Sequence, residues 1–143
     1  MPALAGARRE ARERALSLLY EAESKGAAPS AVLSELPVEP DRYVVEVVRG
    51  VERDLSQIDA LLARHSIGWG VERMPAVDRA LLRMATFELL DRLDVPTAVV
   101  ISEAVELAKQ YSTEESGRFV NGVLATVAGV VRGPAPAVEA GPA

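Results

Sequence analysis

The sequence predicts an all-α protein of seven helices, one of them short, and two observations support this class. Apolar residues recur every three or four positions over most of the 143 residues, which is the spacing of one face of an α-helix. Prolines and glycines separate these stretches, and no segment reads convincingly as a strand. The length suits a single domain with one core, which we expect to span residues 1–132.

The first helix is predicted at residues 7–25, where Gly26 is placed to end it. Residues 27–40 form a connector punctuated by prolines, in which a short helix fits between Ser30 and Leu36. The buried stripe of the first helix consists of small and branched apolar residues: Ala11, Ala15, Leu18, Leu19 and Ala22.

Two further helices are expected between residues 41 and 65, meeting near Asp54. The β-branched run at 44–51 is compatible with a strand, but charged residues at helical spacing within it favour a helix. Residues 66–70 form a turn around Trp69, the only tryptophan. Trp69 is either a stacking platform for a base or a plug where two helices diverge.

A helix at residues 76–93 is expected to organise the rest of the chain. It is apolar on nearly all sides, which is typical of a helix in the middle of a larger helical body. Glu88 is the exception, because it lies on the main apolar face four residues after Met84. A carboxylate there is either solvated at an exposed helix end or paired with a basic group.

Two more helices complete the predicted fold. One starts after Pro96 and is expected to turn Ala98 inward and Glu103 toward water. The last covers residues 117–131, where a close helix contact would offset the cost of Gly122. Residues 133–143 are rich in proline, glycine and alanine and are expected to be a disordered tail.

The composition excludes several classes of function. A net charge of −5 argues against a protein that coats nucleic acid over its whole surface. The absence of cysteine and the single histidine, His65, exclude disulfides, thiol nucleophiles and an ordinary zinc site. No apolar run approaches the ~18 residues that span a membrane, and no signal peptide is visible. We therefore expect a cytoplasmic protein without a metal or a membrane partner.

No recognised catalytic motif is present. The sequence has no glycine-rich phosphate loop, no zincin motif and no nucleophile elbow. A pair of carboxylates acting as general acid and base stays open, although nothing marks such a pair. The chain reads as a binding module with no cofactor, and not as an enzyme.

The strongest candidate site is a row of arginines near the start of the first helix. Arg8, Arg9 and Arg12 fall within a sector about 100° wide, and Tyr20 lies further along the same side as Arg9. Guanidinium groups suit phosphates and base edges. Cations at a helix N-terminus oppose the macrodipole, which argues against a purely structural role. A solvated charged face is the alternative.

Three stretches of the chain resemble the NusB family of transcription antitermination factors. They are ARREARERALSLLY, VDRALLRMATFELL and DVPTAVVISEAVELAKQYSTEESGRFVNGVL, and the resemblance covers residues 7–131. It implies an all-helical fold of two packed three-helix bundles. It also implies a factor that pairs with NusE, a small-subunit ribosomal protein, binds boxA RNA and joins the Nus complex on RNA polymerase. Such a factor suppresses premature termination, chiefly in ribosomal RNA operons.

The resemblance assigns roles to individual residues by position. A basic group of NusE is expected to meet the carboxylate of Glu88. Glu10 departs from the family pattern, because several members have a further arginine there, so RNA affinity without NusE is expected to be weak. The expected RNA-binding residues are Arg8, Arg9, Arg12 and Arg118, and the expected partner-binding residues are Tyr20, Arg83 and Glu88.

Two alternatives remain at this stage. The first is a helical scaffold that only self-associates, and some NusB-like proteins form homodimers that hide the RNA-binding face. The second is enzymatic, because NusB-like domains precede certain RNA cytosine methyltransferases. These 143 residues contain no cofactor-binding Rossmann segment, so methyltransferase activity is not expected.

Overall fold

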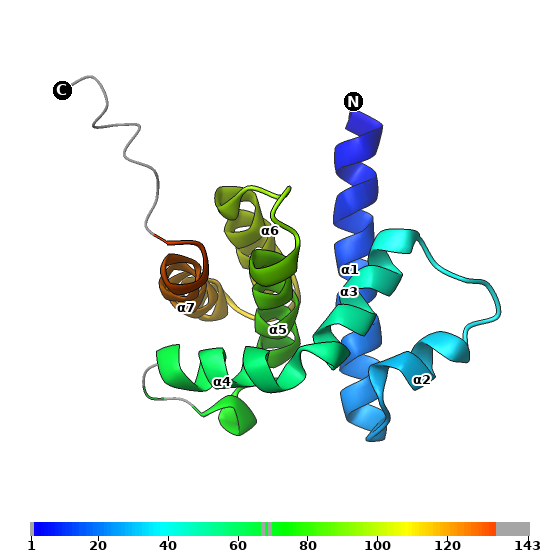
Figure 1. The fold of residues 1–143 in the computed structure, drawn as a ribbon, viewed down its shortest axis with the longest axis horizontal. Helices are drawn as coiled ribbons and strands as arrows, with labels where there is room; N and C mark the ends of the chain where they lie inside the picture. The colour runs from blue at the N-terminus through cyan, green and yellow to red at the C-terminus, as the bar shows by residue number, and fades with distance from the viewer. Residues whose placement is uncertain (1, 67, 69, 134–143) are drawn as a thin grey trace.

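The computed structural model describes residues 2–66, 68 and 70–133, and Figure 1 shows its fold. Within these residues the chain forms seven α-helices and one 3₁₀ helix, with no strand, which confirms the predicted all-α class. The elements are α1 (Pro2–Lys25), α2 (Pro29–Ser34), α3 (Arg42–Arg53), α4 (Leu55–His65), η1 (Val71–Arg73), α5 (Ala76–Asp91), α6 (Thr97–Tyr111) and α7 (Glu114–Arg132).

The helices form two groups that meet at α5. Helices α1, α2 and α3 pack against one another, and α5, α6 and α7 form the second group. Helix α4 leads from α3 across to α5 and α7, while α5 also packs on α1 and α3 (Figure 1). Helix α5 is buried on most of its surface, as its all-round apolar sequence predicts.

Local sequence signals explain several helix ends. Gly26 has a φ of +64°, the left-handed conformation that commonly ends a helix, and it stops α1. Asp41 caps α3, because its Oδ1 accepts a hydrogen bond of 2.7 Å from the Tyr43 amide. The Oγ1 of Thr113 accepts one of 2.9 Å from the Ser116 amide and starts α7.

A glycine allows the two groups of helices to approach closely. Gly50 on α3 lies directly against the ring of Phe87 on α5, and a Cβ atom at this position would clash with that ring. Close packing of this kind leaves no room for even one added methyl group. The fit of Phe87 over Gly50 therefore sets the spacing between α3 and α5.

Several local expectations were wrong. Helix α1 begins at Pro2 and α7 at Glu114, both earlier than predicted, and η1 was not predicted. Ala98 is exposed, because the first turn of α6 presents it to solvent. A Cβ atom at Gly122 would have no neighbour within 4 Å, so no close helix contact offsets its cost. Trp69 and residues 134–143 lie outside the described residues.

Candidate nucleic-acid interface

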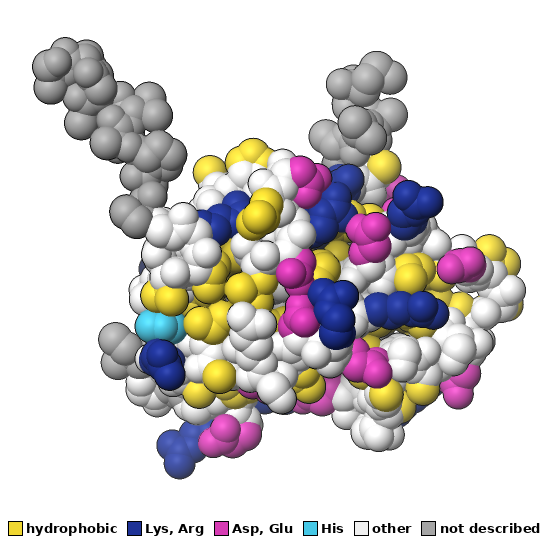
Figure 2. Space-filling view, in the orientation of Figure 1, with side chains coloured by type: hydrophobic (Ala, Val, Ile, Leu, Met, Phe, Trp, Pro, Cys, Tyr) yellow, Lys and Arg dark blue, Asp and Glu magenta, His cyan; other side chains and the backbone are white. Residues whose placement is uncertain are grey.

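A pocket beside the N-terminal half of α1 brings the predicted arginine row together with the start of α6. It has a volume of about 400 Å³. Figure 2 shows basic and acidic side chains interspersed over one face of the molecule. The pocket itself is also mixed in charge, because Asp94 and Glu103 line it beside the arginines. The pocket is lined by Gly6, Arg8, Arg9, Arg12, Asp94, Val95, Pro96, Val99 and Glu103.

Arg12 turns inward and forms a buried ion pair with Glu88. Its Nε donates to the two Glu88 carboxylate oxygens at 3.3 and 3.0 Å, and its Nη2 lies 3.0 Å from Oε2. The side chains are 3% and 1% exposed. Glu88 is therefore not solvated, and the basic group that meets it here comes from α1 of the same chain. Neither side chain reaches RNA or a protein partner in this conformation.

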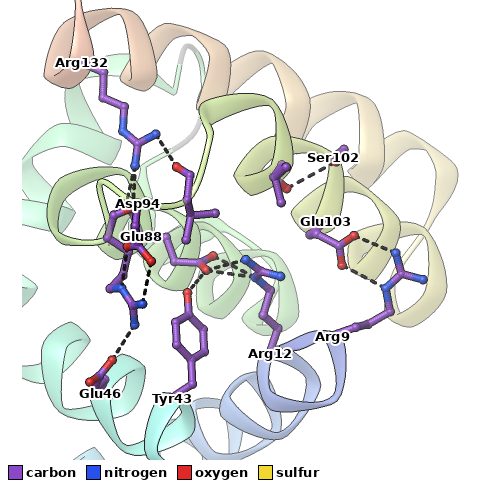
Figure 3. Close-up of polar contacts among 12 residues, drawn as sticks. Arg9, Arg12, Tyr43, Glu46, Glu88, Asp94, Ser102, Glu103 and Arg132 are labelled. Atoms are coloured by element: carbon purple, nitrogen blue, oxygen red, sulfur yellow. Dashed lines mark hydrogen bonds and ion pairs between the residues drawn. The ribbon is translucent and has the colours of Figure 1, made fainter. Parts of the chain in front are cut away.

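Tyr43 on α3 completes this buried cluster. Its hydroxyl donates a hydrogen bond to Glu88 Oε2, and Figure 3 shows Tyr43 and Arg12 converging on that carboxylate. Burial raises the pKa of Tyr43, and the negative charge of Glu88 raises it further. The phenol is thus held neutral as a donor to Glu88.

Arg8 lies over the ring of Tyr43, with 4.0 Å between its guanidinium carbon and the ring centroid. This is within cation–π range. The guanidinium of Arg92 lies 4.7 Å from the same centroid, and Arg92 is also bound to Asp94 and Glu46. Within the described part of the chain Arg8 forms no ion pair, and the nearest opposing charge in the pocket is the carboxylate of Asp94, which is bound to Arg92.

Arg9 is exposed but occupied by a carboxylate from α6. Its Nε and Nη2 donate to the two oxygens of Glu103 at 3.0 and 2.7 Å, as Figure 3 shows. The hydrogen bond from Arg9 holds the pKa of Glu103 below its ordinary value. The expectation that Glu103 faces water is therefore wrong, because it bridges α6 to α1.

Arg132, at the end of α7, fixes the connection between α5 and α6. Its guanidinium donates to the carbonyls of Glu88, Leu89, Arg92 and Val95 and to the Thr97 hydroxyl, at 2.8–3.1 Å. These carbonyls belong to the C-terminal end of α5 and to the connection, where backbone donors run out. The carbonyls of Glu88 and Arg92 also accept backbone amides, whereas Arg132 is the donor to those of Leu89 and Val95. The segment that lines the pocket is thereby held in place (Figure 3).

The predicted partner-binding residues occupy different environments. Tyr20 is 44% exposed and lines a largely apolar pocket of about 330 Å³ together with Leu16, Val77 and Tyr111. Arg83 is bound to Asp59 through two hydrogen bonds of 2.9 and 2.8 Å. The structure thus joins Glu88 to the arginine row and leaves Tyr20 and Arg83 at two other places.

Arg118 is separate from the α1 arginines. It is exposed near the start of α7 and is not among the described residues that line the arginine pocket. The structure therefore brings together Arg8, Arg9 and Arg12, and it does not add Arg118 to them.

Sequence reasoning missed three residues of this site: Tyr43, Glu103 and Arg132. Tyr43 carries one signal in the sequence, because a tyrosine on the apolar face of a helix usually has a hydrogen-bond partner for its hydroxyl. Glu103 and Arg132 carry no such signal, because their partners lie 94 and 35 to 44 positions away in the chain.

The described residues contain no group of three or more histidine or acidic side chains that could hold a metal ion. Among the same residues, no helix has both the length and the apolar character that crossing a bilayer requires. The candidate site consists of the charged side chains and the two pockets along α1.

Comparisons with known proteins agree on one family. The profile of the NusB family matches residues 9–129. The chain is 50% identical over 126 residues to the "Transcription antitermination protein NusB" of Kineococcus radiotolerans, covering 85% of this chain and 93% of that protein. It is 50% identical over 131 residues to the protein of the same name from Saccharopolyspora erythraea, covering 87% and 88%.

Solved structures give the same result. T. maritima NusB superposes with a TM-score of 0.77 at 35% identity, covering 94% of this chain and 96% of that one. A NusB chain from a structure of the antitermination factors NusB and NusE in complex with dsRNA gives a TM-score of 0.74 at 27% identity, covering 87% and 97%. The chain belongs to the NusB family.

Proposed function

We propose that this protein is a transcription antitermination factor that binds boxA RNA together with NusE. In this role it joins the Nus complex on RNA polymerase and suppresses premature termination in ribosomal RNA operons. It acts by binding and not by catalysis, in the cytoplasm. Support comes from relatives that are named antitermination proteins and from the similar chain in a complex of NusB, NusE and dsRNA.

The observation that carries this proposal is the position of Arg8. Its guanidinium lies against the Tyr43 ring beside the pocket, with no carboxylate bound to it among the described residues. A cation presented in a hollow of an acidic protein attracts a phosphate locally. The exposed Val99 on the same pocket offers an apolar surface for a base.

The arginines then have different roles. Arg8 contacts RNA directly, and Arg9 contacts it once Glu103 is displaced. Arg118 is a separate basic contact at the start of α7. Arg12 supports the site from within, because its charge is satisfied by Glu88 in the interior.

NusE is assigned to the pocket around Tyr20. This pocket combines apolar side chains with an exposed phenol, a composition typical of protein interfaces. Arg83 lies outside this pocket, where a partner would have to compete with Asp59 for it. Glu88 affects the binding of NusE indirectly, because it holds α1 against α5 through Arg12.

The two proposed surfaces adjoin along α1. Arg9, Glu13 and Tyr20 are spaced by four and seven residues, which places them on one side of the helix. Helix α6 runs beside them, because Glu103 binds Arg9 and the Tyr111 hydroxyl donates to Glu13 at 3.0 Å. RNA and NusE would thus occupy neighbouring parts of one face.

The test is a titration of labelled boxA RNA with the protein alone, with NusE, and with NusE and an RNA of scrambled sequence. We expect weak binding alone, tighter binding with NusE, and a preference for boxA over the scrambled sequence. Light scattering in parallel reports the mass of the complexes. A protein that only self-associates, with no RNA binding in the presence of NusE, would contradict the proposal.

A further inference from the structure

The arginine pocket holds fewer available cations than its residues suggest. Arg12 is paired with Glu88 in the interior. Arg9 is paired with Glu103 at the rim. Of the three arginines, only Arg8 has no ion pair among the described residues. One cation without an ion pair is a weak attraction for a phosphate backbone, so the state of Arg9 decides how strongly this pocket binds RNA.

We propose that Glu103 is an intramolecular competitor for RNA, occupying the Arg9 guanidinium that a phosphate of the RNA would otherwise bind. A carboxylate and a phosphate each offer two oxygens to the same edge of a guanidinium group. The inference rests on the proposed function, because it takes RNA as the ligand of this pocket.

The geometry shows that the pair can open without moving a helix. Arg9 uses Nε and Nη2 for Glu103, at 3.0 and 2.7 Å. Its side chain is 60% exposed, whereas that of Glu103 is 17% exposed. The long arginine side chain is therefore free to turn outward to a phosphate, while Glu103 stays on α6.

The negative charge of Glu103 indicates that this residue competes with RNA for Arg9 and does not only orient the arginine. Arg9 keeps the pKa of Glu103 below its ordinary value, so the carboxylate is ionised at neutral pH. A phosphate bound at Arg9 would then lie beside a second negative group and be repelled by it. Removing that charge should therefore strengthen RNA binding.

Glu88 cannot compete with RNA in the same way. The Arg12–Glu88 pair is almost fully buried, and separating a buried pair leaves uncompensated charges in the interior. The Arg9–Glu103 pair is partly exposed, and pairs of this kind are weak enough for a ligand to displace. Of these two pairs, only Arg9–Glu103 can exchange its carboxylate for RNA.

The experiment compares E103Q with E106Q in the presence of NusE, using the anisotropy of labelled boxA RNA. Glu106 is exposed on the same helix, so E106Q makes the same charge change without breaking the bonds to Arg9. We expect E103Q to bind up to about fivefold more tightly than wild type, the upper end of what an exposed ion pair contributes. Glu106 acts on Arg9 only through its charge, so E106Q should give a much smaller gain than E103Q.

A double-mutant cycle assigns the gain to Arg9. In an R9Q background, E103Q should give no gain beyond that of E106Q. Thermal unfolding of each variant checks that the fold is intact. The inference is overturned if E103Q matches E106Q, if E103Q weakens binding, or if its gain persists with R9Q. Failure of the wild type to bind RNA with NusE would overturn the proposed function and this inference together.

Discussion

Nη2 of Arg12 lies 3.0 Å from Oε2 of Glu88, and this ion pair joins α1 to α5 in the interior. The family resemblance predicts that Arg12 contacts RNA and that Glu88 contacts NusE. Because both side chains are buried, a substitution at either position first alters the packing between the two helix groups. Any effect on a binding surface would follow from that change. Stability must therefore be measured before binding is interpreted at these positions.

Replacement of Arg12 by methionine is expected to destabilise the protein by about 3–5 kcal/mol, because Glu88 would remain as an unpaired buried charge. Urea unfolding followed by circular dichroism measures this cost. R9Q, which breaks a partly exposed pair, should unfold close to wild type. The double variant R12M/E88L should recover part of the loss, and an R12M protein as stable as wild type would contradict the buried pair.

Tyr43 is expected to have two separable roles. Y43F removes the hydrogen bond to Glu88 but keeps the ring under Arg8, so it should cost about 1–3 kcal/mol of stability and leave RNA affinity unchanged. Y43L also removes the ring and should weaken RNA binding, because Arg8 loses its cation–π support. Urea unfolding and RNA titration of both variants test this, and equal RNA affinity of Y43F and Y43L would exclude the positioning role.

Arg132 is expected to stabilise the connection between α5 and α6. R132A removes a donor from four carbonyls, of which those of Glu88 and Arg92 keep a backbone amide donor. We expect faster hydrogen exchange at residues 92–97 together with a loss of about 1–3 kcal/mol. R132K should recover little of this, because an ammonium group cannot reproduce the planar set of donors. Unchanged exchange in R132A would show that the connection is held by other contacts.

The acid dependence of stability should include a contribution from Glu23. A hydrogen bond from Arg79 holds the pKa of Glu23 below its ordinary value of 4.5. A pKa that is lower in the folded than in the unfolded state gives stability above pH 4.5 that is lost as the pH falls through the folded value. E23Q should therefore be less stable than wild type at pH 7, and the gap should narrow toward pH 3. Melting temperatures of wild type and E23Q at pH 7 and pH 3 test this, and E39Q, at an exposed position, is the control.

The helices could be predicted because their periodicity is local. The spacing of apolar residues, together with the positions of prolines and glycines, predicted the seven α-helices of the described residues, and Asp41 and Thr113 cap two of them. The ends were less accurate, because fraying and packing decide the last turn. Gly122 was misjudged because the sequence cannot say which face of α7 has a neighbour.

The site was predicted only in part, because its contacts are not local. Arg9 and Arg12 are about 60° apart around α1, yet one is exposed and the other almost fully buried. This difference arises because Arg12 points at α5, and its partner Glu88 is 76 positions away. The sequence identified the odd carboxylate on an apolar face and left a solvated helix end or a basic partner as explanations, but it could not place that partner on α1.

The central claim is that Arg8 gives this acidic protein its local RNA contact, and one titration tests it most directly. Labelled boxA RNA is titrated with wild type, R8Q and R14Q in the presence of NusE over a range of salt concentrations. Arg14 is exposed on the same helix, so R14Q removes the same charge as R8Q at a position outside the pocket. We expect R8Q to bind more weakly with a salt slope smaller by about 0.7, and R14Q to resemble wild type. Equal effects of R8Q and R14Q on affinity and slope would contradict the claim.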